Sequence, residues 1–180
     1  MITSLDIIYI TLNEHLTNSL IFHAQLAEYF RFLCLEKYAC MQEEVFSKEL
    51  TNLGIVKRNY ISIEQKIIRL PDGFSTDILI PEEWYRLRTD DLTDKTKREC
   101  IKTAMEFWYN HSKESMQLYS DLIGQLTSLG EYTTYNILID LYVKSMEDFD
   151  IVRHYMHKFI DTDYNLEKII DENEHLLSNS

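Results

Sequence analysis

Pairs of histidine and carboxylate residues at helical spacing are the first features of this sequence that could do chemistry. His154 and His157 are three residues apart, and Glu147 and Asp150 precede them within two turns. On one face of a helix, such a set can bind a single metal ion such as zinc. The same spacing also arises on any polar or hydrogen-bonded helix face, so both interpretations stay open. They apply equally to two further pairs, His23 with Glu28 and His111 with Glu114.

Other catalytic constellations are missing from the sequence. No serine or cysteine stands in the sharp turn or helix-start context that activates a nucleophile. Four isolated glycines cannot build a phosphate-binding loop. The three cysteines, Cys34, Cys40 and Cys100, have no metal-ligand spacing. We therefore expect a protein that is not an enzyme and has no cofactor, with Cys34 and Cys40 as small core residues in a reducing cytoplasm.

The chain is strongly acidic, and the charge is unevenly placed. Thirty Asp and Glu residues outnumber 18 Lys and Arg residues, which gives a formal net charge of -12. Residues 131–180 alone hold 11 acidic and 4 basic residues. An acidic protein repels the nucleic-acid backbone and attracts proteins with basic surfaces, although the same charge also serves solubility. The acidic face that we predict comprises Glu147, Asp148, Asp150, Asp161, Asp163, Glu167, Asp171, Glu172 and Glu174.

Helices must position these residues. Apolar residues recur every three or four positions over most of the chain, which contains only 4 glycines and 2 prolines. Both prolines fall in one stretch, which begins with the turn signal Pro71-Asp72-Gly73. No run approaches the ~18 consecutive apolar residues that a membrane helix requires. The pattern predicts helices over about residues 4–33, 39–69, 97–129, 133–160 and 164–177, with a crossover over 70–95.

Particular residues set the predicted helix ends and faces. Ser4 is predicted to cap the first helix, and Thr96-Lys97-Arg98-Glu99 matches a capping box at the start of the third. Gly54 stays in phase with the second helix, which we expect to continue past it, with the glycine allowing a neighbour to approach closely. The fourth helix is predicted to bury Tyr135, Ile139, Tyr142, Val143, Met146, Phe149, Val152 or Arg153, Met156 and Phe159.

The lengths of the links between these helices predict the fold class. Short links place the first and second helices antiparallel, and likewise the third and fourth. The long connection allows the third helix to start far from the end of the second. The sequence therefore predicts a single all-α domain over residues 1–180. It is an antiparallel four-helix bundle with one long crossover between helices 2 and 3 and a short C-terminal helix.

This order of helices resembles the ferritin-like superfamily over roughly residues 5–177. Residues 12–20 resemble the start of its first helix, and residues 42–50 resemble its second-helix motif. The resemblance implies a di-metal centre, with a Glu from each of two helices and Glu-x-x-His from the other two. Here the first-helix ligand position is Ser19, and the second helix reads Glu44-x-x-Ser47. The only Glu-x-x-His is Glu172 with His175 on the terminal helix, so the chain resembles a degenerate member whose metal ligands are largely missing.

The first hypothesis for function is a non-enzymatic acidic interaction protein. Its acidic face would imitate a DNA backbone and inhibit a nucleic-acid-binding protein or nuclease, as small acidic phage and mobile-element inhibitors of the anti-CRISPR type do. It predicts a partner with a basic surface or groove, no direct contact with nucleic acid or membrane, and a homodimer as the default assembly. The expected location is the cytoplasm of a bacterium or of a phage-infected cell.

The second hypothesis comes from a different class. It is a divergent ferritin-like metal–carboxylate protein that binds or oxidises iron or manganese. Its ligands would be Glu44, Glu106, Glu114, Glu147 and His154.

Overall fold

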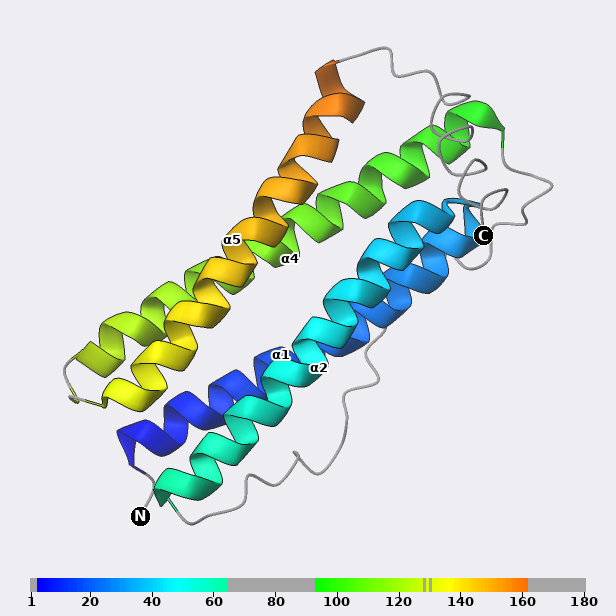
Figure 1. Ribbon diagram of the computed structural model, residues 1–180. Coiled ribbons are helices and arrows are strands. Elements are labelled where there is room, and N and C mark those ends of the chain that lie inside the picture. Colours follow the sequence, from blue (N-terminus) through cyan, green and yellow to red (C-terminus); the bar gives the residue numbers. More distant parts are fainter. Residues whose placement is uncertain (1–2, 65–92, 128, 130, 162–180) are drawn as a thin grey trace.

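Four long helices make up most of the described chain. The computed structural model describes residues 3–64, 93–127, 129 and 131–161. The helices are α1 (Ser4–Phe32), α2 (Glu36–Glu64), α4 (Asp94–Thr127) and α5 (Tyr132–Asp161). Figure 1 shows them as two hairpins, α1 with α2 and α4 with α5, that lie side by side. The predicted all-α class is confirmed.

Side-chain contacts establish that neighbouring helices run antiparallel. On α1 and α4, His15 contacts Ser115 while Ser19 contacts His111, so the numbers rise on one helix as they fall on the other. Along α1 and α2, Asp6 meets Tyr60 and His23 meets Gln42. The chain therefore leaves α2 at one end of the bundle and enters α4 at the other (Figure 1). The sequence predicted a long connection between these two helices because it allows the later helix to start far from the end of the earlier one.

Most predicted helix bounds agree with the structure to within about three residues. The second helix begins at Glu36 rather than at residue 39, and the third begins at Asp94 rather than at residue 97. The predicted helices over 4–33 and 39–69 leave a turn over residues 34–38, and the observed turn lies at its start, where Cys34 has a positive φ of 59°. Residues 65–69, most of the predicted crossover over 70–95 and the predicted helix over 164–177 lie outside the described residues.

The caps differ from the prediction. Thr3, not Ser4, caps α1, because its hydroxyl accepts a hydrogen bond from the Asp6 amide while the Asp6 carboxylate accepts one from the Thr3 amide. At α4, the Thr93 hydroxyl accepts from the amide of Thr96 at 3.2 Å, so Thr96 stands inside the helix and does not cap it. In both cases the helix begins one turn or less before the expected position.

Three further expectations about residue environments were wrong in whole or in part. Cys34 and Cys40 are exposed, whereas Cys100 is buried. Gly54 does lie inside α2, as expected, but a Cβ placed there would meet no atom of the described residues within 4 Å, so none of them approaches it closely. On α5 the predicted inward stripe is confirmed only in part. Val152 is buried, and Tyr135, Tyr142 and Met156 are partly buried against the core, but Val143 and Met146 are exposed. The other fully buried positions, each one residue before a predicted one, are Thr134, Leu138, Leu141 and Ser145.

The apolar core is divided into two clusters along the bundle. One contains Phe22, Leu26 and Trp108, and the other contains Leu12, Leu16 and Tyr119. Between them, α1 contributes Ser19 and α4 contributes Ser112, both with about 5% or less of their surface exposed. The bundle therefore has a polar layer at mid-length.

Candidate functional site

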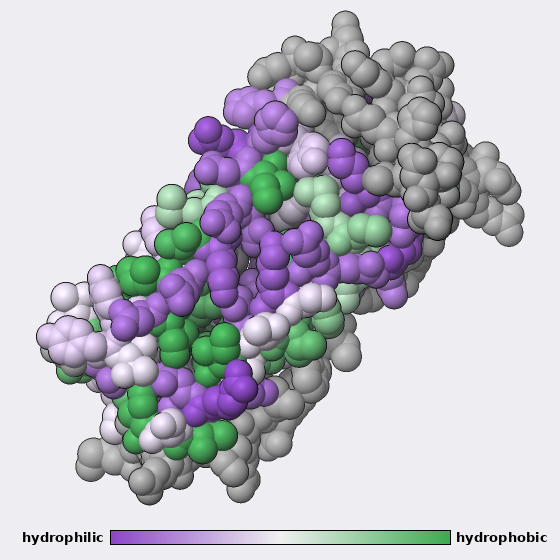
Figure 2. Space-filling view, viewed as in Figure 1, coloured by the Kyte–Doolittle hydropathy of each residue, from purple (hydrophilic) through white to green (hydrophobic). Residues whose placement is uncertain are grey.

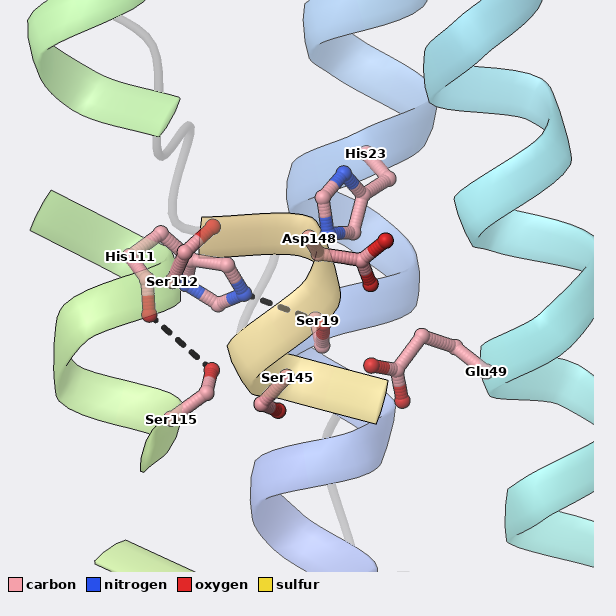
Figure 3. A pocket seen from close by; sticks show the side chains of 8 residues that line it. All are labelled: Ser19, His23, Glu49, His111, Ser112, Ser115, Ser145 and Asp148. Atoms are coloured by element: carbon pink, nitrogen blue, oxygen red, sulfur yellow. Dashed lines mark hydrogen bonds between the residues drawn. The ribbon is translucent and has the colours of Figure 1, made fainter. Parts of the chain in front are cut away.

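Eight side chains surround a small cavity in this polar layer. They come from all four helices and point toward one another in Figure 3. We call them the central polar cluster: Ser19, His23, Glu49, His111, Ser112, Ser115, Ser145 and Asp148. The cavity offers about 10 Å³, which is room for one water molecule. In the three helices that contribute more than one residue, spacings of three or four, as for Ser145 and Asp148, place these side chains on the inward face.

Two histidine–serine contacts join α1 to α4 at the edge of the cluster. Nε2 of His111 lies 3.0 Å from Oγ of Ser19, and Nε2 of His15 lies 3.0 Å from Oγ of Ser115. The Ser115 hydroxyl donates its proton to the backbone carbonyl of His111 at 2.9 Å. It must therefore accept from His15, whose imidazole carries its proton on Nε2.

All three imidazoles of this region are held in the neutral form. Burial lowers the pKa of His15 to about 4. Burial likewise lowers the pKa of His23 to about 4, although its 2.7 Å hydrogen bond with Oε1 of Gln42 raises it and the charge of His15 lowers it further. For His111, burial and then the other two histidines lower the pKa well below its usual value. The amide oxygen of Gln42 only accepts, so His23 donates from Nδ1.

Glu49 on α2 and Asp148 on α5 bring two carboxyl groups to the same cavity. The pKa of Glu49 is raised to about 7, mainly by burial and also by the charge of Asp148, while Lys144 and Ser19 lower it. Burial also raises the pKa of Asp148 to about 6, against the lowering effect of Lys48 and with the raising effect of Glu147. Oε2 of Glu49 is buried and has no hydrogen-bond partner among the described residues. The pair therefore binds protons at a pH where exposed carboxyl groups are ionised.

The seam between α2 and α5 continues this polar region to the surface. Figure 2 shows hydrophilic side chains gathered along it. Nζ of Lys48 lies 3.1 Å from the carboxylate of Glu44, and Nζ of Lys144 donates to the side-chain carbonyl of Asn52 at 3.0 Å. Partial burial lowers the pKa of Lys48, but Glu44 and the charges of Asp148 and Glu147 raise it on balance. Acidic groups therefore surround this lysine from both helices.

The residues of the predicted metal site do not converge. Glu44 is paired with Lys48, and Glu106 faces Lys102 at 3.8 Å. Glu114 lines a separate groove between α1 and α4, while Glu147 and His154 are exposed on α5. Within the described part of the chain, no three His, Cys, Asp or Glu side chains are arranged to hold a metal ion.

The structure describes only part of the predicted acidic face. Glu147 and Asp150 are exposed on α5, as are the nearby His154 and His157. Asp148 instead turns into the central polar cluster. Asp161 ends α5, but its side chain lies outside the described residues. The whole of the remaining set lies outside them too: Asp163, Glu167, Asp171, Glu172 and Glu174.

Sequence reasoning did not single out Glu49 or Ser145. Both stand at positions where an inward-facing apolar residue is the ordinary choice, Glu49 between Val45 and Val56 and Ser145 between Leu141 and Val152. The signal that could have found them is a polar residue in phase with an apolar stripe. On α5 the predicted stripe had the wrong phase, so this signal was hidden.

The fold and the site together define an all-helical four-helix protein with no metal-binding group among its described residues. No protein-family model matches the chain, and no curated protein matches its sequence. No helix within the described ranges combines the length and the apolar character that a membrane crossing requires. Function must therefore be argued from the side chains themselves.

Proposed function

We propose that this chain is a non-enzymatic interaction protein that binds a partner with a basic surface through its acidic face. The observation that carries the proposal is the exposure of Glu147 and Asp150 on α5, with exposed Glu44 on α2 and Glu147 both close enough to Lys48 to raise its pKa. Exposed carboxylates that are ionised at neutral pH steer and bind cationic surfaces. Residues 131–180 hold 11 acidic and 4 basic residues, so this part of the sequence carries further negative charge.

The specific form of the proposal is an inhibitor that imitates DNA. A basic groove that binds a phosphate backbone presents Lys and Arg side chains at close spacing. Carboxylates one helical turn apart, such as Glu147 and Asp150, match this arrangement with charges of the same sign as phosphate. A nuclease or another nucleic-acid-binding protein is therefore the proposed partner, of the kind that phage and mobile-element inhibitors of the anti-CRISPR type block.

The proposal includes an ancestry and a location. The order of the helices and the polar layer at mid-bundle support a degenerate ferritin-like scaffold that has replaced its metal-holding side chains. A reducing cytoplasm is consistent with three cysteines that are all free thiols. The proposal includes self-association as a homodimer. It includes no direct contact with nucleic acid or with a membrane.

A pair of charge-matched variants tests the proposal. The double variant Glu147→Gln/Asp150→Asn removes two carboxylates from α5, and Glu14→Gln/Glu28→Gln removes two exposed ones from α1. Both variants change the net charge equally. We expect capture of basic nucleic-acid-binding proteins to weaken about tenfold or more for the first and to stay unchanged for the second, since only the first lies in the proposed face.

Salt and DNA provide the second measurement. Capture by the wild-type chain should fall steeply between about 50 and about 300 mM salt, because screening weakens exposed charge pairs. Duplex DNA should compete for the captured partner. Capture that is insensitive to salt, or lost equally in both double variants, would contradict the acidic-face mechanism. Stoichiometric iron or manganese in the purified protein would favour the metal–carboxylate function instead.

A further inference from the structure

Oxygen atoms make up much of the lining of the cavity in the central polar cluster. Ser19 contacts His111 and Ser115 contacts His15, each at 3.0 Å, so two of the lining hydroxyls have imidazole partners. The other lining oxygens are the carboxyl oxygens of Glu49 and Asp148 and the hydroxyls of Ser112 and Ser145. Each of these oxygens can accept a hydrogen bond, so the cavity suits a guest that donates.

Glu49 offers this cavity an acceptor that no described residue uses. The residue is 9% exposed, and its Oε2 has no hydrogen-bond partner among the described residues. Figure 3 shows its carboxyl group directed from α2 toward Ser19 and Ser145. A buried carboxylate oxygen without a donor destabilises a folded chain. A guest that donates a hydrogen bond to Oε2 would remove this cost.

The charge of the lining favours a guest that is positive. Two carboxyl groups line the cavity, whereas its imidazoles, His23 and His111, are neutral because burial lowers the pKa of both. The charges of Lys48 and Lys144 act on these carboxyl groups, but both ammonium groups contact other side chains of α2 and neither lysine belongs to the described lining. A cation inside the cavity would therefore offset buried negative charge.

The size of the cavity decides which cation fits. Its volume of about 10 Å³ is room for one water molecule. No three His, Cys, Asp or Glu side chains of the described ranges are arranged around a metal ion, so the cavity favours hydrogen bonds over metal coordination. Of the nitrogen cations that donate hydrogen bonds, ammonium is the one as small as a water molecule.

We propose that the central cavity binds one ammonium ion. The ion donates its N–H groups to oxygens of Glu49, Ser112, Ser145 and Asp148. Because these oxygens come from α2, α4 and α5, the bound ion joins the two hairpins at mid-length. The site uses neither Glu147 nor Asp150, so it is independent of the acidic face.

Thermal melts of the full chain in different chloride salts test the proposal. At about pH 7.5 both carboxyl groups are mostly ionised, since the pKa of Glu49 is about 7 and that of Asp148 about 6. At one total salt concentration of about 200 mM, the melting temperature should be about 3 °C or more higher in ammonium chloride than in potassium chloride. Potassium has a similar size and the same charge, but it donates no hydrogen bond.

Isotope-labelled ammonium provides a direct measurement. Its NMR spectrum should show a bound ion whose protons exchange slowly with water, because the site is buried, and which has contacts to the β protons of Ser145. The variant Ser145→Ala keeps both carboxyl groups and removes one acceptor. It should weaken ammonium binding about fivefold, as expected for the loss of one hydrogen bond.

Two matched variants on α2 locate the effect. Glu49→Gln should abolish the difference between the two salts, whereas Glu44→Gln makes the same change on the exposed side of the helix and should keep it. Circular dichroism shows whether each variant keeps its helices. Equal melting temperatures of the wild type in ammonium and potassium chloride would overturn the proposal. A difference that Glu49→Gln retains, or that Glu44→Gln also loses, would do so too.

Discussion

Tyr9 carries one of the buried side-chain contacts that join the two hairpins. Its hydroxyl lies 2.8 Å from the hydroxyl of Thr134 on α5 and accepts a hydrogen bond from the side-chain amide of Asn59 on α2. Tyr9 and Thr134 are both 0% exposed. No water can replace a lost partner at such a site, so each group depends on the others.

The substitution Tyr9→Phe should therefore lower the free energy of unfolding by about 2 kcal/mol, because it leaves the hydroxyl of Thr134 buried without its partner. Urea denaturation followed by circular dichroism measures the change. Tyr132→Phe is the matched control, since Tyr132 is 79% exposed and loses its hydroxyl at the surface. A loss for Tyr9→Phe no larger than that of the control would show that the contact does not stabilise the bundle.

At the scale of the helices, two glycines lie in helix interiors without a packing reason. In the part of the chain that the structure describes, a Cβ at Gly54 in α2 or at Gly124 in α4 would meet nothing within 4 Å. Glycine lowers helix stability relative to alanine because the unfolded chain has more conformations to lose. Gly54→Ala and Gly124→Ala should each raise the free energy of unfolding by about 0.5–1 kcal/mol.

Thermal melts of the single variants and of the double variant test this prediction. Ala24 is exposed in α1, so Ala24→Gly is a control that should lower the melting temperature by a similar amount. The two stabilising effects should add, since the glycines lie on different hairpins. A lower melting temperature for Gly54→Ala would mean that something does approach the glycine, as the sequence had suggested.

The sequence predicted the helices well because each carries several turns of apolar repeat. It predicted their ends less well, since Thr3, Ser4, Thr93 and Thr96 are all chemically able to cap a helix. Only the backbone geometry decides which hydroxyl reaches an unpaired amide. The phase of α5 was wrong for a related reason: Val143 and Met146 are apolar yet exposed, while Thr134 and Ser145 are polar yet buried.

At the scale of the whole molecule, the central polar cluster depends on contacts between residues far apart in the sequence. Ser19 meets His111, and Glu49 faces Asp148, in each case from a different hairpin. Periodicity places each residue on a face of its own helix but does not give the register between hairpins. For that reason the sequence indicated the order of the helices and missed Glu49, whose burial only the assembled bundle creates.

The assembled bundle should show two opposing proton linkages. The pKa of His15 and of His23 is lowered from 6.5 to about 4, and that of His111 is lowered too, so their contribution to stability is present above pH 6.5 and lost as pH falls toward 4. The raised pKa values of Glu49 and Asp148 act in the opposite direction. Their contribution is present below the unfolded values of 4.5 and 3.8 and is lost as pH rises through about 7 and about 6.

Between about pH 4.5 and 6 the two carboxyl groups therefore offset part of the loss of stability that the histidines cause as pH falls. The double variant Glu49→Gln/Asp148→Asn lacks the two carboxyl groups that release protons on unfolding. Near pH 5 its unfolding should therefore take up about two more protons than unfolding of the wild type does. As pH falls, the free energy of unfolding of this variant should therefore decrease more steeply than that of the wild type, by up to about 3 kcal/mol more per pH unit. Denaturation at pH 5, 6 and 7 measures this slope. The exposed pair Glu14→Gln/Glu28→Gln should leave it unchanged, and parallel slopes for all three proteins would mean that Glu49 and Asp148 are already ionised inside the bundle.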